Sequence, residues 1–377
     1  MKVGVVKLGA RISFSSIGTS GGTGEAISII KMLQLGGADV HIYTKILKKD
    51  VLLPEYTFHD ILTSDLSMSE MDALIVINGT VNYFGGADAP DQTLNYVAIN
   101  KFAGPVFYIY CDPELTLKHL WPNIAKRDWG KNYSEKDINI VRDDIIYVSQ
   151  PYLVDVIFED IKKEKGAVIP KKVIHYPFER FPCLNDRLEI NPSPVVDLMY
   201  GGTMRGGRRA KKMAQFYFGY PDDILVEMFG KIEAEDFKGK AAAYIDGLTH
   251  PKFTGPVNYD RMLNKMNTAM CHVVIGDPYY EETQDMAQRA YESIWAGNIV
   301  FIDKDLDTIK RTFPKSEFLQ EWAYVENRDD VIERIQLLKE TPNLREEILE
   351  MQISGIEFVA QKYCDDFVKL LETNING

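Results

Sequence analysis

The chain has few cysteines and no long apolar run, and both absences narrow what it can be. Its 377 residues include only Cys111, Cys183, Cys271 and Cys364, which are far apart and form no paired CxxC spacing. This argues against a zinc site and a disulfide framework and fits a reducing cytoplasm. No apolar run approaches the ~20 residues that span a bilayer. The N-terminal "MKVGVVKLGA" indicates a first strand, so we expect no signal peptide.

Positive charge is also scarce, because 43 Lys and Arg residues face 55 Asp and Glu residues and leave a formal net charge of -12. Nucleic-acid binding normally uses a basic face, so contact with DNA would need a local basic surface. Against this background, residues 200–213, "YGGTMRGGRRAKKM", concentrate basic side chains in a glycine-rich turn. Such a turn suits the binding of a phosphate. Alternatively, it is a solvated turn whose charges keep the protein soluble, and this stretch alone does not distinguish the two roles.

The length of the chain suits two domains. Short apolar runs, interpreted as strands, alternate with helical patterns at residues 3–9, 39–44, 73–79, 105–112, 143–150, 195–202, 223–230, 269–277 and 297–303. Apolar strands separated by helices predict parallel sheets covered on both faces. We therefore expect an α/β protein with two Rossmann-like, doubly wound domains facing a central cleft. The first would span 1–180, joined by a C-terminal helix at 356–377, and the second 181–355.

Ligands of such sheets bind beyond the carboxyl ends of the strands, and two acidic residues lie there in the first half. Glu25 follows the glycine-rich "SIGTSGGTG" at the expected start of a helix over 25–37, where a charge–dipole contribution is the alternative role. The glycines do not fit GxGxxG, so a nicotinamide-binding motif is unsupported. Asp112 ends a strand and precedes a proline, so it is a candidate general base or a turn residue.

The second half supplies groups for a phosphate. Arg205 and Arg209 are four residues apart and share one face if a helix begins at the turn, so they can converge on a diphosphate. Arg289 and Glu292 are three apart and can hold a phosphate and a ribose hydroxyl, or simply form an ion pair within a helix. Carboxylates in the first half and phosphate-binding groups in the second match two-domain, nucleotide-sugar-dependent glycosyltransferases.

A series of longer segments is more specific. It comprises "VNYFGG" (81–86), "LWPNIAKRDW" (120–129), "DLMYGGTMRGGRRAKKM" (197–213), "FTGPV" (253–257), "VVIGD" (273–277) and "RAYESIWAGNIVFID" (289–303). The chain resembles the DNA β-glucosyltransferase family of T-even bacteriophages in the sequence, order and spacing of these segments. A close relative of that family that uses another UDP-sugar, such as an arabinosyltransferase, fits the same resemblance. That family glucosylates 5-hydroxymethylcytosine in duplex DNA with UDP-glucose.

The resemblance implies a glycosyltransferase B type of fold and an inverting mechanism, with Asp112 as the catalytic base and Glu25 near the donor sugar. The first domain would hold DNA and the second the UDP-sugar, with Val257 giving a main-chain contact to uracil. The donor-binding residues implied are Gly201, Gly202, Thr203, Met204, Arg205, Arg209, Phe229, Gly230, Val257, Arg289 and Glu292. Arg208, Lys211 and Lys212 are expected to be solvated charges on a helix face.

On the DNA side, the resemblance implies that a loop carrying Asn82, Tyr83 and Phe84 enters the duplex near a flipped base. The basic set Lys118, Lys126 and Arg127 would face the DNA backbone. The implied partners are duplex DNA containing 5-hydroxymethylcytosine and a UDP-sugar co-substrate, with Mg or Mn stimulating the reaction without a protein metal site. A monomer in the cytoplasm of the infected bacterium, away from membranes, is expected.

Departures from the family pattern leave the donor sugar open between glucose and a pentose such as arabinose. The N-terminal loop is longer and richer in glycine, one residue is added before Arg289, and "GGADAPDQ" replaces a more basic stretch. Other functions also stay open: a glycosyltransferase with a small-molecule or protein acceptor, which the acidic charge suits, and a DNA-binding protein without enzymatic activity. A nicotinamide oxidoreductase is a distant alternative because the glycine spacing is wrong.

Overall fold

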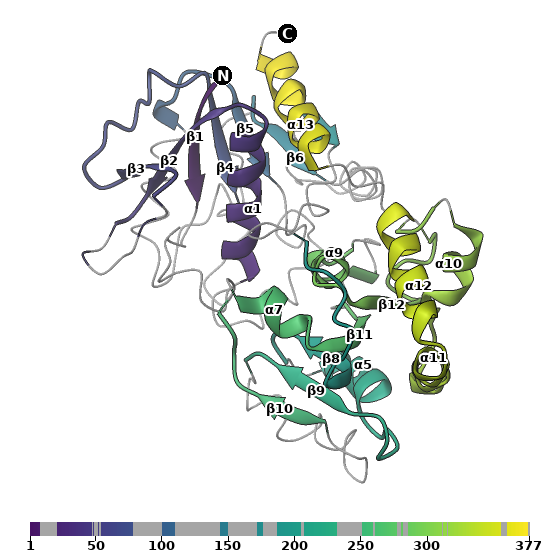
Figure 1. Cartoon of the computed structure of the whole chain (residues 1–377). Coiled ribbons are helices and arrows are strands. Elements are labelled where there is room, and N and C mark those ends of the chain that lie inside the picture. The colour runs from purple at the N-terminus through teal and green to yellow at the C-terminus, as the bar shows by residue number, and fades with distance from the viewer. Residues whose placement is uncertain are drawn as a thin grey trace. The chain divides into compact units, whose positions relative to one another are not determined.

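The computed structural model of the protein contains two compact units, one formed by Met1–Cys183 with Val359–Gly377 and the other by Leu184–Phe358. Both are α/β units built on a parallel sheet (Figure 1), so the prediction of two doubly wound α/β domains is confirmed. The structure describes residues 1–7, 21–46, 48, 52, 54–77, 100–109, 144–149, 172–175, 187–204, 207–231, 251–258, 261–276, 280–281, 286–310, 312–314, 316–355 and 360–375.

The N-terminal unit has a parallel sheet whose described strands follow the order β3-β2-β1-β4-β5-β6-β7. The direction of winding reverses between β1 and β4, and ligands of such sheets bind beyond the carboxyl ends of strands at this point. All five residues of β4 are buried, as expected for a central strand covered on both faces. The strands are β1 (Lys2–Lys7), β2 (Asp39–Thr44), β3 (Thr57–Asp60), β4 (Ala73–Ile77), β5 (Val106–Ile109), β6 (Ile146–Ser149) and β7 (Lys172–His175).

Helix α1 (Gly21–Leu35) begins four residues before the predicted start at Glu25, and its apolar residues from Ala26 to Leu33 are buried. It packs against the C-terminal helix α13 (Ala360–Ile375), which thereby returns to the N-terminal unit (Figure 1). A side chain at Gly36 would collide with the Cys364 carbonyl and lie 2.5 Å from Val368 Cγ2. Glycine at this position therefore allows the two helices to approach closely.

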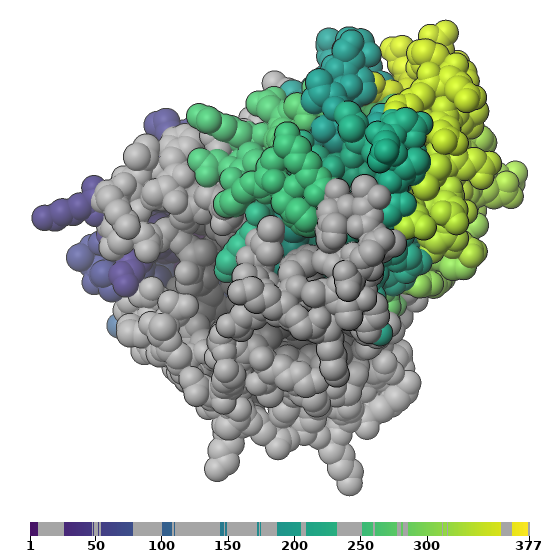
Figure 2. Space-filling model, turned by 90° about the horizontal axis from the view of Figure 1, so that it is seen from below, coloured from purple at the N-terminus to yellow at the C-terminus, as the bar shows by residue number. Residues whose placement is uncertain are grey.

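The second unit has a parallel sheet in the order β10-β9-β8-β11-β12-β13, and its winding reverses between β8 and β11. Helix α11 lies beside α5, where yellow-green atoms border teal ones in Figure 2. The strands are β8 (Val196–Gly201), β9 (Val226–Phe229), β10 (Lys252–Thr254), β11 (Ala269–Val274), β12 (Ile299–Asp303) and β13 (Tyr324–Val325). The helices described are α5 (Gly207–Tyr217), α7 (Met262–Met266), α9 (Gln288–Trp295), α10 (Glu317–Trp322), α11 (Arg328–Glu340) and α12 (Pro342–Gly355).

The helical C-terminal region is divided at Thr341, between α11 and α12. Pro342 opens α12 directly after α11, because proline lacks an N–H and fits only the first turn of a helix. Among the described residues, no helix is long and apolar enough to cross a membrane.

The negative charge is unevenly shared between the two units. Residues 184–358 hold 21 basic and 30 acidic residues, a net charge of -9, whereas the rest of the chain accounts for -3. The acidity of the protein therefore belongs mainly to the second unit.

Candidate donor-phosphate site

Two helices of the second unit begin after the strands that flank the reversal point, and each has an arginine in its first turn. Arg209 is the third residue of α5, which follows β8, and Arg289 is the second residue of α9, which follows β11. Helix N-termini carry a partial positive charge and suit anions. Along the chain, the carboxyl ends of β8 and β11 are therefore each followed by a helix N-terminus that carries an arginine.

The glycine-rich loop after β8 is bonded to the end of the neighbouring strand. The N–H of Gly202 donates to the carbonyl of Phe229 at 3.0 Å, and the N–H of Met204 donates to the carbonyl of Lys231 at 2.8 Å. These bonds extend the pairing of β8 and β9 beyond both strands. Since the side chain of Met204 is fully buried, these contacts shape the loop and anchor it in the core.

Glycines are required where the two loops meet. Gly230 has a φ of 135°, which side chains rarely adopt, and a side chain there would collide with the Gly202 carbonyl. A side chain at Gly201 would run into the ring of Phe229. The predicted donor-binding glycines thus permit close packing of the backbone at the strand ends.

Tyr200, the residue before the glycines, links Arg209 to this loop. Arg209 Nη2 donates to the Tyr200 hydroxyl at 2.7 Å, and that hydroxyl donates to the Thr203 carbonyl at 3.3 Å. The Tyr200 ring is stacked with His272 of β11, with 6.3 Å between centroids. Sequence reasoning identified Arg209 and Thr203 but neither of the two rings beside them.

His272 is buried in β11 and is neutral. Its Nδ1 lies 2.7 Å from the Met199 carbonyl, so this nitrogen carries the proton and donates it. Burial, together with the nearby positive charge of Arg289, lowers the pKa of His272 from 6.5 to about 3. The imidazole therefore adds no positive charge beside the arginines.

Arg289 and Glu292 form the ion pair that the sequence allowed, with 3.0 Å between Arg289 Nη1 and Glu292 Oε2. The Arg289 guanidinium also contacts the sulfur atoms of Met262 and Met266 from α7. Glu292 is buried, with 3% of its surface exposed. This carboxylate and the two methionines fix the orientation of the Arg289 side chain.

Val257 is half-buried and follows β10 by three residues. The segment before it is anchored by Glu227, a buried carboxylate of β9 that accepts a hydrogen bond from Thr254 Oγ1 at 2.9 Å. Lys265 of α7 forms an ion pair with the same carboxylate. No sequence pattern indicates this cluster, because its three members come from separate elements.

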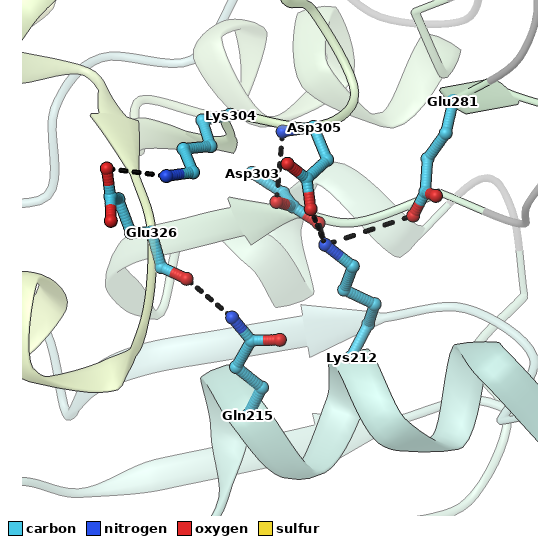
Figure 3. Close-up of polar contacts among 7 residues, drawn as sticks. All are labelled: Lys212, Gln215, Glu281, Asp303, Lys304, Asp305 and Glu326. Atoms are coloured by element: carbon cyan, nitrogen blue, oxygen red, sulfur yellow. Dashed lines mark hydrogen bonds and ion pairs between the residues drawn. The ribbon is translucent and has the colours of Figure 1, made fainter.

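Lys212 was predicted to be solvated, and that prediction is wrong. Its Nζ lies 2.7 Å from Asp303 Oδ2, 2.6 Å from Asp305 Oδ2 and 3.9 Å from Glu281 Oε1 (Figure 3). Burial alone would lower the pKa of Lys212, but its hydrogen bonds to the two aspartates outweigh burial and raise it. Burial raises the pKa of Asp303, against the opposing effect of the ammonium. The neighbouring Lys211 is exposed, as predicted.

Several predicted site residues lie outside the described residues, and their roles stay predictions. They are Asp112, Arg205, Asn82, Tyr83, Phe84, Lys118, Lys126 and Arg127. Glu25 lies in α1 and its side chain is also outside the described set, as is that of Arg208. Within the described ranges, no three His, Cys, Asp or Glu side chains are arranged to hold a metal ion.

Comparison with known proteins confirms the resemblance seen in the sequence. The family model of bacteriophage T4 beta-glucosyltransferase matches residues 1–182. DNA beta-glucosyltransferase of Enterobacteria phage T4 is 26% identical over 355 residues, which are 93% of this chain and 93% of that protein. The structure of phage T4 BGT in complex with UDP and Mn2+ is 26% identical, with a TM-score of 0.72 and coverage of 98% and 99% of the two chains.

The fold extends to more distant enzymes. Sucrose-phosphate synthase from Thermosynechococcus elongatus, 10% identical, matches with a TM-score of 0.60 over 100% of this chain and 99% of its own. The protein therefore has the glycosyltransferase B type of fold that the sequence predicted.

Proposed function

We propose that this protein, a relative of the T4 DNA β-glucosyltransferase over nearly its whole length, is an inverting UDP-sugar-dependent DNA glycosyltransferase. It would transfer glucose, or a pentose such as arabinose, to the hydroxymethyl group of 5-hydroxymethylcytosine in duplex DNA. The observation that carries the proposal is the pair of arginine-bearing helix N-termini that follow β8 and β11. This arrangement suits the diphosphate of a nucleotide sugar.

The donor would be held by the second unit. Arg209 and Arg289, with Arg205 beside them in the sequence of the loop, would stabilise the negative charge that develops on the UDP leaving group. Fixed cationic groups of this kind act most strongly when they are already in place before the reaction. Val257 would contact the uracil, on a segment that Glu227 anchors through Thr254.

The acceptor would be activated by Asp112, which follows β5 by three residues along the chain. Its carboxylate would take the proton of the hydroxymethyl group while the hydroxymethyl oxygen attacks the anomeric carbon. The bond from that carbon to the UDP oxygen breaks, its electron pair leaves with UDP, and the anomeric configuration inverts. The base must first leave the duplex stack, and Asn82, Tyr83 and Phe84 would assist there.

A divalent cation fits this scheme as a companion of the diphosphate. One solved structure of the T4 enzyme is in complex with UDP and Mn2+, and the described part of this chain offers no cluster of three acidic, His or Cys ligands. The cation would supply further neutralisation of the diphosphate charge when bound. The protein is proposed to act as a monomer in the cytoplasm of the infected bacterium.

One alternative is supported by a specific observation, the net charge of -12, which suits a small-molecule or protein acceptor better than DNA. The uneven distribution of that charge weakens the case against DNA, because residues 184–358 account for -9 of it. Duplex DNA would be bound by the N-terminal unit, whose sequence contains Lys118, Lys126 and Arg127.

Acceptor-dependent UDP release tests the proposal. With UDP-glucose or UDP-arabinose, we expect release that depends on duplex DNA containing 5-hydroxymethylcytosine and is absent with unmodified duplex. Release stimulated only by a small hydroxylated acceptor would replace the DNA proposal with the alternative. Binding of the modified duplex without any UDP release would instead indicate a DNA-binding protein without activity.

A further inference from the structure

The Tyr200 hydroxyl has no part in the chemistry proposed above, yet it lies between two parts of the donor site. The side chain comes from the end of β8 and is 2% exposed. Its hydroxyl accepts a hydrogen bond from Arg209 Nη2 at 2.7 Å and donates one to the Thr203 carbonyl at 3.3 Å. Two bonds thus run in one direction, from the guanidinium through the phenol to the glycine-rich loop, and bonds in such chains strengthen one another.

We propose that Tyr200 is a positioning residue for the donor diphosphate, whose hydroxyl holds the Arg209 guanidinium and the 201–204 loop in their binding geometry before UDP-sugar arrives. The inference rests on the proposed function, because it assumes that Arg209 binds the diphosphate. An arginine side chain has many rotamers, and a site that has already selected one binds its ligand more tightly.

The chemistry of a phenol suits this task better than that of a carboxylate. A carboxylate beside Arg209 would neutralise the positive charge that a diphosphate needs, whereas a neutral hydroxyl accepts the hydrogen bond and leaves the charge in place. The contrast with Arg289 is direct, since Arg289 is held by the carboxylate of Glu292.

The Tyr200 ring is itself held in place by its neighbours. It meets Tyr217 edge-on, with centroids 5.2 Å apart and planes at 73°, and it is stacked with His272 at an interplanar angle of 15°. A Cβ atom at Gly202 would lie 3.0 Å from the Tyr200 hydroxyl. The glycine at 202 therefore leaves room for the hydroxyl, which explains the Tyr-Gly-Gly order of the loop.

Removing only the hydroxyl tests the inference. Tyr200→Phe should weaken the binding of UDP, measured by calorimetry, by about fivefold, because Arg209 loses its hydrogen bond to this hydroxyl. The KM for UDP-sugar should rise by a similar factor while kcat changes less. Tyr220→Phe is the matched control: this residue is also buried, and its hydroxyl donates to the Phe216 carbonyl at 2.7 Å. This control should bind UDP like the wild type.

A double-mutant cycle separates positioning from general stability. If Tyr200 acts through Arg209, Tyr200→Phe should cause no further loss of UDP affinity in an Arg209→Ala background. Fully additive losses, or a Tyr200→Phe variant with unchanged affinity, would overturn the assignment while leaving the proposed function intact. A wild-type protein that binds no UDP would overturn the proposed function, and the assignment with it.

Discussion

Two arginines of the second unit are held by different kinds of partner. Arg289 is paired with the buried carboxylate of Glu292, whereas Arg209 donates to the neutral hydroxyl of Tyr200. The neutral imidazole of His272 lies beside the Tyr200 ring and near Arg289. Positive charge at this end of the sheet therefore comes from the guanidinium groups and the helix N-termini.

Arg209→Ala should weaken the binding of UDP, because a charge-assisted hydrogen bond of this kind contributes ~1.5–3 kcal/mol. Arg208→Ala should have a much smaller effect, since its predicted role is that of a solvated charge. Calorimetric titration of both variants with UDP compares them directly. Equal losses for the two variants would show that the loop is assigned wrongly.

His272 should make the protein less stable in acid. Its pKa is about 3 when folded and 6.5 ordinarily, so between these values the unfolded chain binds a proton that the folded protein does not. The stabilisation is complete above pH 6.5 and is lost as the pH falls towards 3. In His272→Asn, the free energy of unfolding should fall less steeply between pH 6.5 and 4. An identical slope in both proteins would mean that His272 titrates normally.

At the scale of secondary structure, the strands that the sequence predicted are the central ones. The four described strands that it did not predict, β3, β7, β10 and β13, are the outermost strands of the two sheets. Outer strands have only one neighbouring strand, so they can be short and polar; β3 reads "TFHD" and β13 has only two residues. A continuous apolar run identifies a strand that is buried on both faces, and these short outer strands lack such a run.

The same limit applies to the site. Arg209, Arg289 and Glu292 could be proposed from the sequence because spacing along a helix or a family motif marks them. Lys212 was misjudged and Tyr200 was overlooked because their partners are distant in the chain: Lys212 is 93 residues from Asp305, and Tyr200 stacks on a ring of β11. A sequence pattern records local neighbours, whereas burial and ion pairing depend on which strands become adjacent.

Lys212 joins α5 to the end of β12, so its loss should loosen the helix that presents Arg209. In Lys212→Met the buried Asp303 carboxylate keeps its charge without its partner, which should cost about 3 kcal/mol of unfolding free energy at neutral pH. Because the pKa of Asp303 is raised, the cost should shrink as acid protonates this carboxyl. Denaturant unfolding at several pH values measures both effects.

Lys211→Met provides the control for this experiment, since Lys211 is the adjacent residue and is exposed. It should change the free energy of unfolding by only about 0.5 kcal/mol. Equal destabilisation by the two substitutions would contradict the role given to the cluster around Lys212.

For the whole molecule, the distribution of charge decides how an acidic protein can hold DNA. The unit with the basic set Lys118, Lys126 and Arg127 carries a net charge of only -3. Substituting Lys126 and Arg127 together by alanine should reduce the slope of log affinity for duplex DNA against log salt by about 2, one for each phosphate that is no longer neutralised.

The affinity for UDP should be unchanged in that double variant. A control with Lys211 and Lys252 replaced by alanine, both exposed residues of the other unit, should keep the wild-type salt slope. If the control flattened the slope as much as the Lys126 and Arg127 variant, the DNA would not be held by the N-terminal unit.

The most direct test of the account is mass spectrometry of nucleosides from duplex DNA containing 5-hydroxymethylcytosine after incubation with the protein and each of a panel of UDP-sugars. One new nucleoside, heavier by the mass of a single glycosyl residue, is expected with the UDP-sugar that the protein uses. Unmodified cytosine should stay unchanged, and Asp112→Asn should give almost no product while still binding UDP. Absence of the new nucleoside with every UDP-sugar, or undiminished product from Asp112→Asn, would contradict the account.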